Sequence, residues 1–242
     1  MASDDCQSLP LSGRESGWSA MAKQVPHQAQ QILISWIFIV ASIALFLDFV
    51  SLQCLVRGDS NTFVALNNWF GIVSCINWLL GFAVLVHWLK RVGATRLGLT
   101  GAVLKLVASV FFNLQPMTGS AGIAGGAGWW WSNLVGILFF HIGNVVSCVD
   151  FGIQKPPGAE PKKGVLYHGN LPITGMWIYQ LATWLLVCSN LLACAWGGEV
   201  DKAWLQTSHW VVMVCQYAGA LFLLLGSVVF CVWCDGFATF AL

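Results

Sequence analysis

The sequence predicts an all-α fold, a polytopic transmembrane helical bundle of six spans arranged as three parallel helical-hairpin repeats. Of the 242 residues, 57% are hydrophobic and only 9% are charged, whereas about a quarter of the residues of a soluble domain are charged. The apolar residues gather in runs of about 20, the length of helix that crosses a bilayer. A pattern of glycines and amides also recurs inside these runs.

The expected spans are separated by polar or glycine-rich links. They cover residues 32–55, 64–89, 97–114, 130–149, 173–196 and 210–234. The third is the weakest, because it is short, contains Lys105 and begins with Gly98 and Gly101, which lower helix propensity. If this segment lies in the membrane interface instead, the chain has five spans.

The basic residues favour six spans. With six, eight of the eleven Lys and Arg residues fall on one side of the membrane: Arg14, Lys23, Lys90, Arg91, Arg96, Lys155, Lys162 and Lys163. With five, the second basic cluster would move to the side opposite the first. Because Lys and Arg collect in cytoplasmic loops, we expect an integral membrane protein with both termini in the cytoplasm.

The links divide the chain into five segments. Residues 1–30 are polar and are expected to form a disordered cytoplasmic tail. The three hairpins are residues 31–93, 94–152 and 173–242. Residues 153–172 contain four prolines and are expected to form a polar cytoplasmic linker between the second and third hairpins.

The repeat is clearest in the fourth and sixth spans. Residues 133–144 and 216–227 share an Asn or Gln, a glycine three residues later, and a second glycine that is followed by Asn or Ser. Small residues let membrane helices approach closely, and side-chain amides bond between helices. We therefore expect helix packing from Asn133, Gly136, Gly143, Gln216, Gly219 and Gly226.

The first hairpin carries a degraded copy of this pattern. There Asn68-x-x-Gly71 matches the first half, and Trp78 stands in the place of the second glycine. The odd-numbered spans share small residues as well, in segments 40–43, 107–110 and 181–183. Each unit has two crossings, so the three hairpins are expected to insert with the same orientation.

The fourth and sixth spans, GILFFHIGNVV and GALFLLLGSVV, resemble the helices of the YrhK-like family, small membrane modules of two helices with a Gly-Ser step. The first hairpin fits the family poorly, since Trp78 replaces a glycine there. The resemblance implies a membrane architecture and no particular activity.

An ionisable residue within a span is a functional candidate by default, and Lys105 is one. One interpretation is that its ammonium snorkels to the cytoplasmic face. The alternative pairs it with Asp150 or His87 in a polar pocket. A salt bridge to Asp48 is not expected, because Asp48 lies toward the outer end of its span.

Other polar residues lie deeper in the spans. His141 is central in the fourth span, one turn from Asn144, while Asn77 and Asn113 belong to other spans. Such residues either make interhelical hydrogen bonds or line a pathway. His141 is also the weak candidate for binding a cofactor whose identity the sequence leaves unknown, as its axial ligand.

Several function classes are excluded by what the sequence lacks. A net charge of +1 gives no basic face for nucleic acid. There is no Gly-x-Ser-x-Gly or His-Glu-x-x-His motif, so no catalytic residue is nominated and no enzyme is expected.

The nine cysteines, including the Cys231-x-x-Cys234 pair, are expected to be packing thiols rather than metal ligands. The Pro-x-Asp/Glu-x-x-Lys/Arg motif of mitochondrial carriers is missing too.

The sequence therefore predicts a non-enzymatic multi-pass membrane protein with a structural or scaffold role. Its partners would be the lipid bilayer and either further copies of itself or the subunits of a membrane complex. The alternative is a small-solute or ion pathway between the hairpins, lined by Lys105, His141, Asn144, Asn77 and Asn113. A weaker alternative is a subunit that carries a pigment or another cofactor.

Overall fold

The computed structural model describes residues 17–56, 61–120, 127–153, 171–195 and 209–234. Within these ranges the protein is all-α. The helices are α1 (Gly17–Val56), α2 (Asn61–Arg91), α3 (Arg96–Ser120), α4 (Ala127–Ile153), α5 (Leu171–Ala195) and α7 (His209–Trp233).

Each of these helices contains a segment long and apolar enough to cross a membrane. The segments are Ala29–Ser51, Ala65–Arg91, Arg96–Leu114, Ser132–Asp150, Pro172–Leu192 and Trp210–Trp233. The prediction of an all-α multi-pass membrane protein with six candidate spans is thus confirmed. The third span is among them, so the five-span alternative does not describe this fold.

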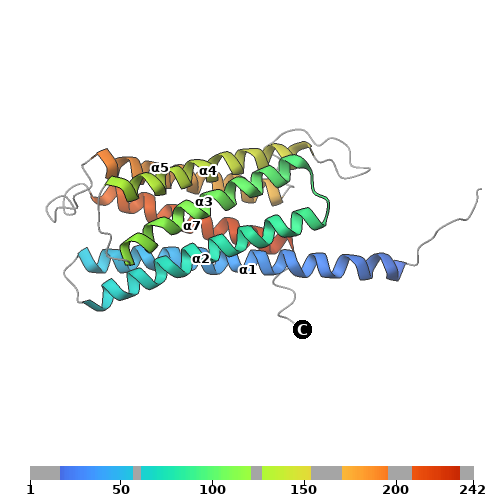
Figure 1. Ribbon diagram of the computed structural model, residues 1–242, viewed down its shortest axis with the longest axis horizontal. Helices are drawn as coiled ribbons and strands as arrows, with labels where there is room; N and C mark the ends of the chain where they lie inside the picture. The colour runs from blue at the N-terminus through green and yellow to red at the C-terminus, as the bar shows by residue number, and fades with distance from the viewer. Residues whose placement is uncertain (1–16, 57–60, 121–126, 154–170, 196–208, 235–242) are drawn as a thin grey trace, which may run out of the picture.

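The helices form a closed ring, in which each packs mainly against two neighbours in the order α1, α2, α3, α4, α5, α7 and back to α1. Packing is most extensive within three hairpins, α1 with α2, α3 with α4, and α5 with α7, and less extensive between one hairpin and the next. All of them run along the long axis of the molecule, and the N-terminal end of α1 projects beyond the others (Figure 1).

Aromatic rings fill the interior of this ring of helices. Some of these contacts join helices that are not neighbours in the ring: Trp78 of α2 meets Phe140 of α4 with ring centroids 5.9 Å apart and Tyr179 of α5 at 6.3 Å. Phe38 of α1 stacks on Trp78 at 5.1 Å. We call the set the central aromatic cluster; it comprises Phe38, Trp78, Phe82, Phe140 and Tyr179, all buried.

The turn between α2 and α3 is tightly specified. Gly93 has a φ of 68°, a left-handed conformation that glycine adopts without steric cost. The amide of Ala94 donates to the carbonyl of Leu89 at 3.0 Å, as in a Schellman C-cap. Thr95 then caps α3, because its Oγ1 accepts from the amide of Gly98 at 3.0 Å.

Two glycines that weaken α3 as an isolated helix lie where it meets α4. A Cβ atom added to Gly98 would lie 2.7 Å from Oδ2 of Asp150, and one added to Gly101 would lie 2.7 Å from Oγ of Ser147. Their small size therefore lets the two helices approach, which compensates for the lower helix propensity.

The N-terminal segment differs from expectation. Residues 1–30 were expected to form a disordered tail, but α1 begins at Gly17. The stretch between Ala20 and Gln31 is rich in Ala and Gln, which favour helix, so α1 extends past its apolar part. The rest of the expected tail, most of the 153–172 linker and the C-terminal end lie outside the described residues.

Candidate functional site

Lys105 lies inside the bundle, on the face of α3 that packs against α4. Its side chain is only 3% exposed. The amine donates to Oγ of Ser147 on α4 at 2.9 Å and to Sδ of Met176 on α5 at 3.4 Å. A thioether is a weak acceptor, so one of the two bonds of this amine is weak.

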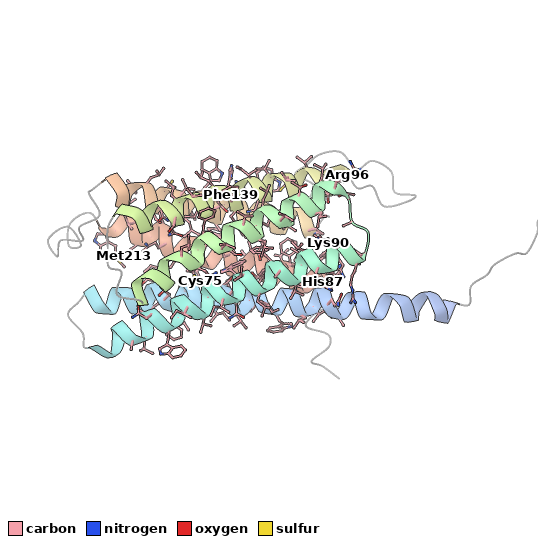
Figure 2. All side chains as sticks on the ribbon, in the orientation of Figure 1. Cys75, His87, Lys90, Arg96, Phe139 and Met213 are labelled. Atoms are coloured by element: carbon pink, nitrogen blue, oxygen red, sulfur yellow. The ribbon has the colours of Figure 1, made fainter. Side chains whose placement is uncertain are left out.

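The expected partners of Lys105 lie elsewhere. The carboxylate of Asp150 accepts a hydrogen bond from Thr95, and His87 lies near the end of the bundle that also bears Lys90 and Arg96 (Figure 2). Within the described ranges no carboxylate pairs with Lys105, and the side chain is too buried to be snorkelling. Asp48 binds Asn67 instead, at 2.6 Å.

A compact group of polar residues joins α4 to α5, one helical turn from Ser147. His141 and Asn144 lie one turn apart on α4, and Gln180 and Thr183 lie one turn apart on α5. The Nδ1 atom of His141 contacts the Nε2 atom of Gln180, and Asn144 donates to Oγ1 of Thr183 at 3.4 Å. We call these residues the α4/α5 polar cluster.

Two oxygens of the α4/α5 polar cluster are buried without a hydrogen-bond donor. They are Oδ1 of Asn144 and Oε1 of Gln180. Both residues are buried, Asn144 completely. A buried amide oxygen without a donor loses the hydrogen bonds that water gave it, so this cluster is incomplete as it stands.

The other residues expected to line a pathway do not join the cluster. Asn77 donates to the carbonyl of Val73 on its own helix at 2.7 Å. Asn113 donates to the carbonyls of Ser109 and, across the α2/α3 interface, of Cys75. The structure thus brings together His141 and Asn144, with Lys105 one turn away, and leaves Asn77 and Asn113 at a different interface.

The residues expected to pack helices lie at helix–helix contacts in most cases. A Cβ atom added to Gly136 would lie 3.1 Å from the carbonyl oxygen of Ala108, and one added to Gly143 would lie 2.9 Å from that of Gly101. Gly219 and Gly226 face α5 in the same way, 3.4 Å from the carbonyl oxygen of Ala182 and 3.3 Å from that of Gly175.

The two amides of that set differ. Asn133 donates to Oδ1 of Asn190 on α5 at 3.0 Å, so it bridges the second and third hairpins. Asn133 and Gln216 hold the same place in the sequence pattern. Asn133 forms a side-chain bridge to the neighbouring hairpin, and Gln216 lies half-buried on α7.

The thiols and the imidazole give no metal centre in the part of the chain that the structure describes. There, no group of three or more His, Cys, Asp or Glu residues is arranged to hold a metal ion. Cys75, Cys148, Cys188, Cys215 and Cys231 form no disulfide. His141, the expected axial ligand of a cofactor, is held by Gln180 and meets the ring of Trp184 edge-on at 5.2 Å.

Sequence reasoning missed Gln180 and Ser147, and it noted Thr183 only as part of the small-residue segment 181–183. Ser147 could have been found, because it lies one turn from Asn144 on the same face of α4. Gln180 is an amide inside an apolar span, which is itself a signal. Met176 carries no such signal, since methionine is an ordinary apolar residue of a membrane helix.

Comparisons with protein-family models, with curated proteins and with solved structures found no match.

Proposed function

We propose that this protein is a non-enzymatic, structural membrane subunit built from three similar helical hairpins. The observation that carries the proposal is the central aromatic cluster. Its rings pack between helices on opposite sides of the bundle, with Trp78 against both Phe140 and Tyr179. Side chains that fill the axis in this way suit a rigid packing unit better than an open central channel.

The proposed repeat is supported by equivalent contacts in the second and third hairpins. In the second, Gly136 and Gly143 of α4 face the carbonyls of Ala108 and Gly101. In the third, Gly219 and Gly226 of α7 face the carbonyls of Ala182 and Gly175. The two glycines of each pair and the two carbonyls of each pair are seven residues apart, so the same surfaces meet at the same spacing.

The first hairpin fits the repeat in a different alignment from that of Asn68 and Gly71. Ser74 of α2 donates to the carbonyl of Ala41 at 2.9 Å, and Gly81 packs on the ring of Phe38. Ser74 and Gly81 are also seven residues apart. In this alignment they correspond to the glycine pairs, and Gly81, not Trp78, corresponds to the second glycine.

Contacts between hairpins support the same relationship. Ser42, Ser109 and Thr183 each follow the corresponding alanine of an odd-numbered span, and all three are almost fully buried. Ser227 of the third hairpin meets Ser42 of the first at 3.3 Å, as Asn144 of the second meets Thr183 of the third at 3.4 Å. Two of the three interfaces between hairpins are therefore similar, whereas Ser109 at the α2/α3 interface bonds the carbonyl of Leu106 on its own helix.

Several finer features belong to this proposal. The hairpins insert in parallel, both termini lie in the cytoplasm, and the partners are further copies or other membrane subunits. The likeness of GILFFHIGNVV and GALFLLLGSVV to the YrhK-like family stays a prediction, and so does a cofactor at His141.

Chemical cross-linking in native membranes tests the structural role. The tagged full-length chain, of 26.3 kDa, is cross-linked before extraction and its mass is then measured. A structural subunit is expected in a defined complex with itself or with other membrane proteins. A chain that stays at its own mass in the membrane would contradict the proposal.

An absorption spectrum of the same sample tests the cofactor prediction, and His141→Ala should release any chromophore found.

A second candidate function, an ion pathway, is favoured by the α4/α5 polar cluster. The pathway would not follow the bundle axis, which the aromatic rings occupy. It would follow the seam between α4 and α5, where Asn133 bonds Asn190, His141 contacts Gln180 and Lys105 bonds Ser147.

A further inference from the structure

We propose that Lys105 and the α4/α5 polar cluster form a hydrated proton-transfer site within the membrane-spanning part of the bundle. The proposal goes beyond a structural role and specifies the ion of the pathway candidate. It starts from Lys105, an ionisable side chain inside a span, where a charge is expensive to maintain.

The charge of Lys105 is not needed for packing. Lys105 lies three residues before Ala108, as Phe38 lies before Ala41 and Tyr179 before Ala182. Each of the three contacts a glycine of the partner helix: Gly143, Gly81 and Gly226 respectively. Two uncharged rings fill this place in the other hairpins, so an apolar side chain satisfies the packing.

The amine of Lys105 is also poorly compensated. An ammonium has three N–H donors, and here the acceptors are one hydroxyl and one thioether, on Ser147 and Met176. In the described part of the chain no carboxylate forms a salt bridge with it, and the carboxylate of Asp150, one turn from Ser147, accepts a hydrogen bond from Thr95. An amine with this environment can release a proton without breaking an ion pair.

The α4/α5 polar cluster offers hydrogen-bond partners for water one helical turn from Ser147, the residue that holds this amine. Buried water is found where it has two to four polar partners. Oδ1 of Asn144 and Oε1 of Gln180 are two buried acceptors without donors. They lie at neighbouring levels, because Asn144 bonds Thr183, one turn from Gln180 on α5. A water molecule that donates to both oxygens completes their hydrogen bonding.

The amine and the cluster share one face of α4. Ser147, which holds the amine, lies one turn from Asn144, and Asn144 lies one turn from His141. Water at the amide oxygens therefore lies along the line from the amine of Lys105 to the imidazole of His141. His141 is a second group able to carry a proton.

The transfer step needs no reactant other than water. An ammonium at Lys105 gives one proton to a water molecule, so that one N–H bond breaks, one O–H bond forms and a hydronium ion and a neutral amine result. The amine then takes up the next proton by the reverse step. Buried or half-buried titratable groups on the helices around Lys105 include Cys148, His141 and Asp150 on α4, Tyr179 on α5 and Cys75 on α2.

Proton flux into liposomes tests the proposal. The purified full-length protein is reconstituted with a pH-sensitive dye inside, and a potassium diffusion potential is set with valinomycin. Wild type is expected to acidify the lumen faster than protein-free liposomes do. Lys105→Met, which keeps the length of the side chain and removes the charge, is expected to fall to the protein-free rate. Lys90→Met, at the exposed end of α2, is the matched control and should keep the wild-type rate.

Folding is monitored in the same samples by thermal unfolding. Lys105→Met is expected to unfold at or above the wild-type temperature, because it removes a buried charge without an opposite partner. Loss of flux in a protein at least as stable then cannot come from misfolding. If Lys105→Met does not fold, Asn144→Leu decides, since it removes one unpartnered amide oxygen and should also lower the flux.

Two results would overturn the proposal. One is a wild-type flux equal to that of protein-free liposomes. The other is a wild-type flux in Lys105→Met, or in Asn144→Leu where that variant decides. Neither result bears on the structural role, which the cross-linking experiment tests by mass alone.

Discussion

Lys105 of α3 and Tyr179 of α5 each pack on a glycine of the helix that follows in the chain, Gly143 and Gly226 respectively. A Cβ atom added to Gly143 would lie 2.8 Å from Cγ of Lys105, and one added to Gly226 would lie 2.6 Å from Cδ1 of Tyr179. A hydrocarbon stem and a phenol ring thus each pack on a glycine. Each contact depends on the absence of a side chain on the glycine. It does not depend on the polar group at the end of the opposite residue, which is an amine in Lys105 and a hydroxyl in Tyr179.

Gly143→Ala is predicted to destabilise the protein. The new methyl group would also lie 2.9 Å from the carbonyl oxygen of Gly101, and backbone cannot move aside as a side-chain end can. Overpacking of this kind costs about 1–3 kcal/mol, which exceeds the gain in helix propensity of about 1 kcal/mol. Thermal unfolding in detergent should show a lower midpoint.

Gly71→Ala is the matched control on α2. Its added Cβ atom would approach only the carboxylate of Asp48, at 3.3 Å, and that side chain is able to shift. With little overpacking, the gain in propensity of up to about 1 kcal/mol should dominate, so the midpoint should stay or rise. Equal losses in both variants would mean that the close contact of α3 and α4 is not what Gly143 provides.

The sequence predicts the membrane spans of this fold better than it predicts which residues of the spans contact one another. Composition and length predict the spans, because the bilayer selects apolar helices whatever their partners. The glycine pairs of α4 and α7 were visible in the sequence as well. In the first hairpin the sequence pattern pointed to Asn68 and Gly71, whereas the alignment that we propose uses Ser74, whose contact with the carbonyl of Ala41 only the structure supplies.

The site was less predictable than the fold. Lys105, His141 and Asn144 stand out as polar residues within spans. Their partners on α5 do not stand out. The face of α5 that meets α4 is set by the packing of the hairpins, and the composition of a span says little about which face that is. Gln180 and Met176 become part of the site only through this contact.

Thr95→Ala is predicted to weaken the junction of α3 and α4. The hydroxyl of Thr95 accepts from the amide of Gly98 and donates to the carboxylate of Asp150. Loss of an N-cap costs about 1 kcal/mol, and Asp150 also loses a partner. Thr100→Ala is the control, because its exposed hydroxyl bonds only the carbonyl of Arg96; its unfolding midpoint should match that of wild type.

Tyr179→Phe is predicted to lower stability by about 0.5–1.5 kcal/mol, the usual net contribution of a hydrogen bond. The phenol hydroxyl lies 2.8 Å from Oγ of Ser227 inside the bundle. The ring should keep its place, since it packs at Gly226 and against Trp78 and Phe140 without help from the hydroxyl. Chemical unfolding in mixed micelles measures the change. An unchanged free energy of unfolding would show that Ser227 is satisfied by Ser42 and Leu223 alone.

The link between α4 and α5 is predicted to lie on the same side of the membrane as the turn between α2 and α3. Two antiparallel crossings separate them, and the basic residues of both regions favour the cytoplasm. A protease site inserted at residues 154–170 should be cut by protease added from the cytoplasmic side. The same site inserted at residues 196–208 should be cut only from the opposite side. Cleavage of both from one side would mean that α5 does not cross, and the ring of spans would then have to be abandoned.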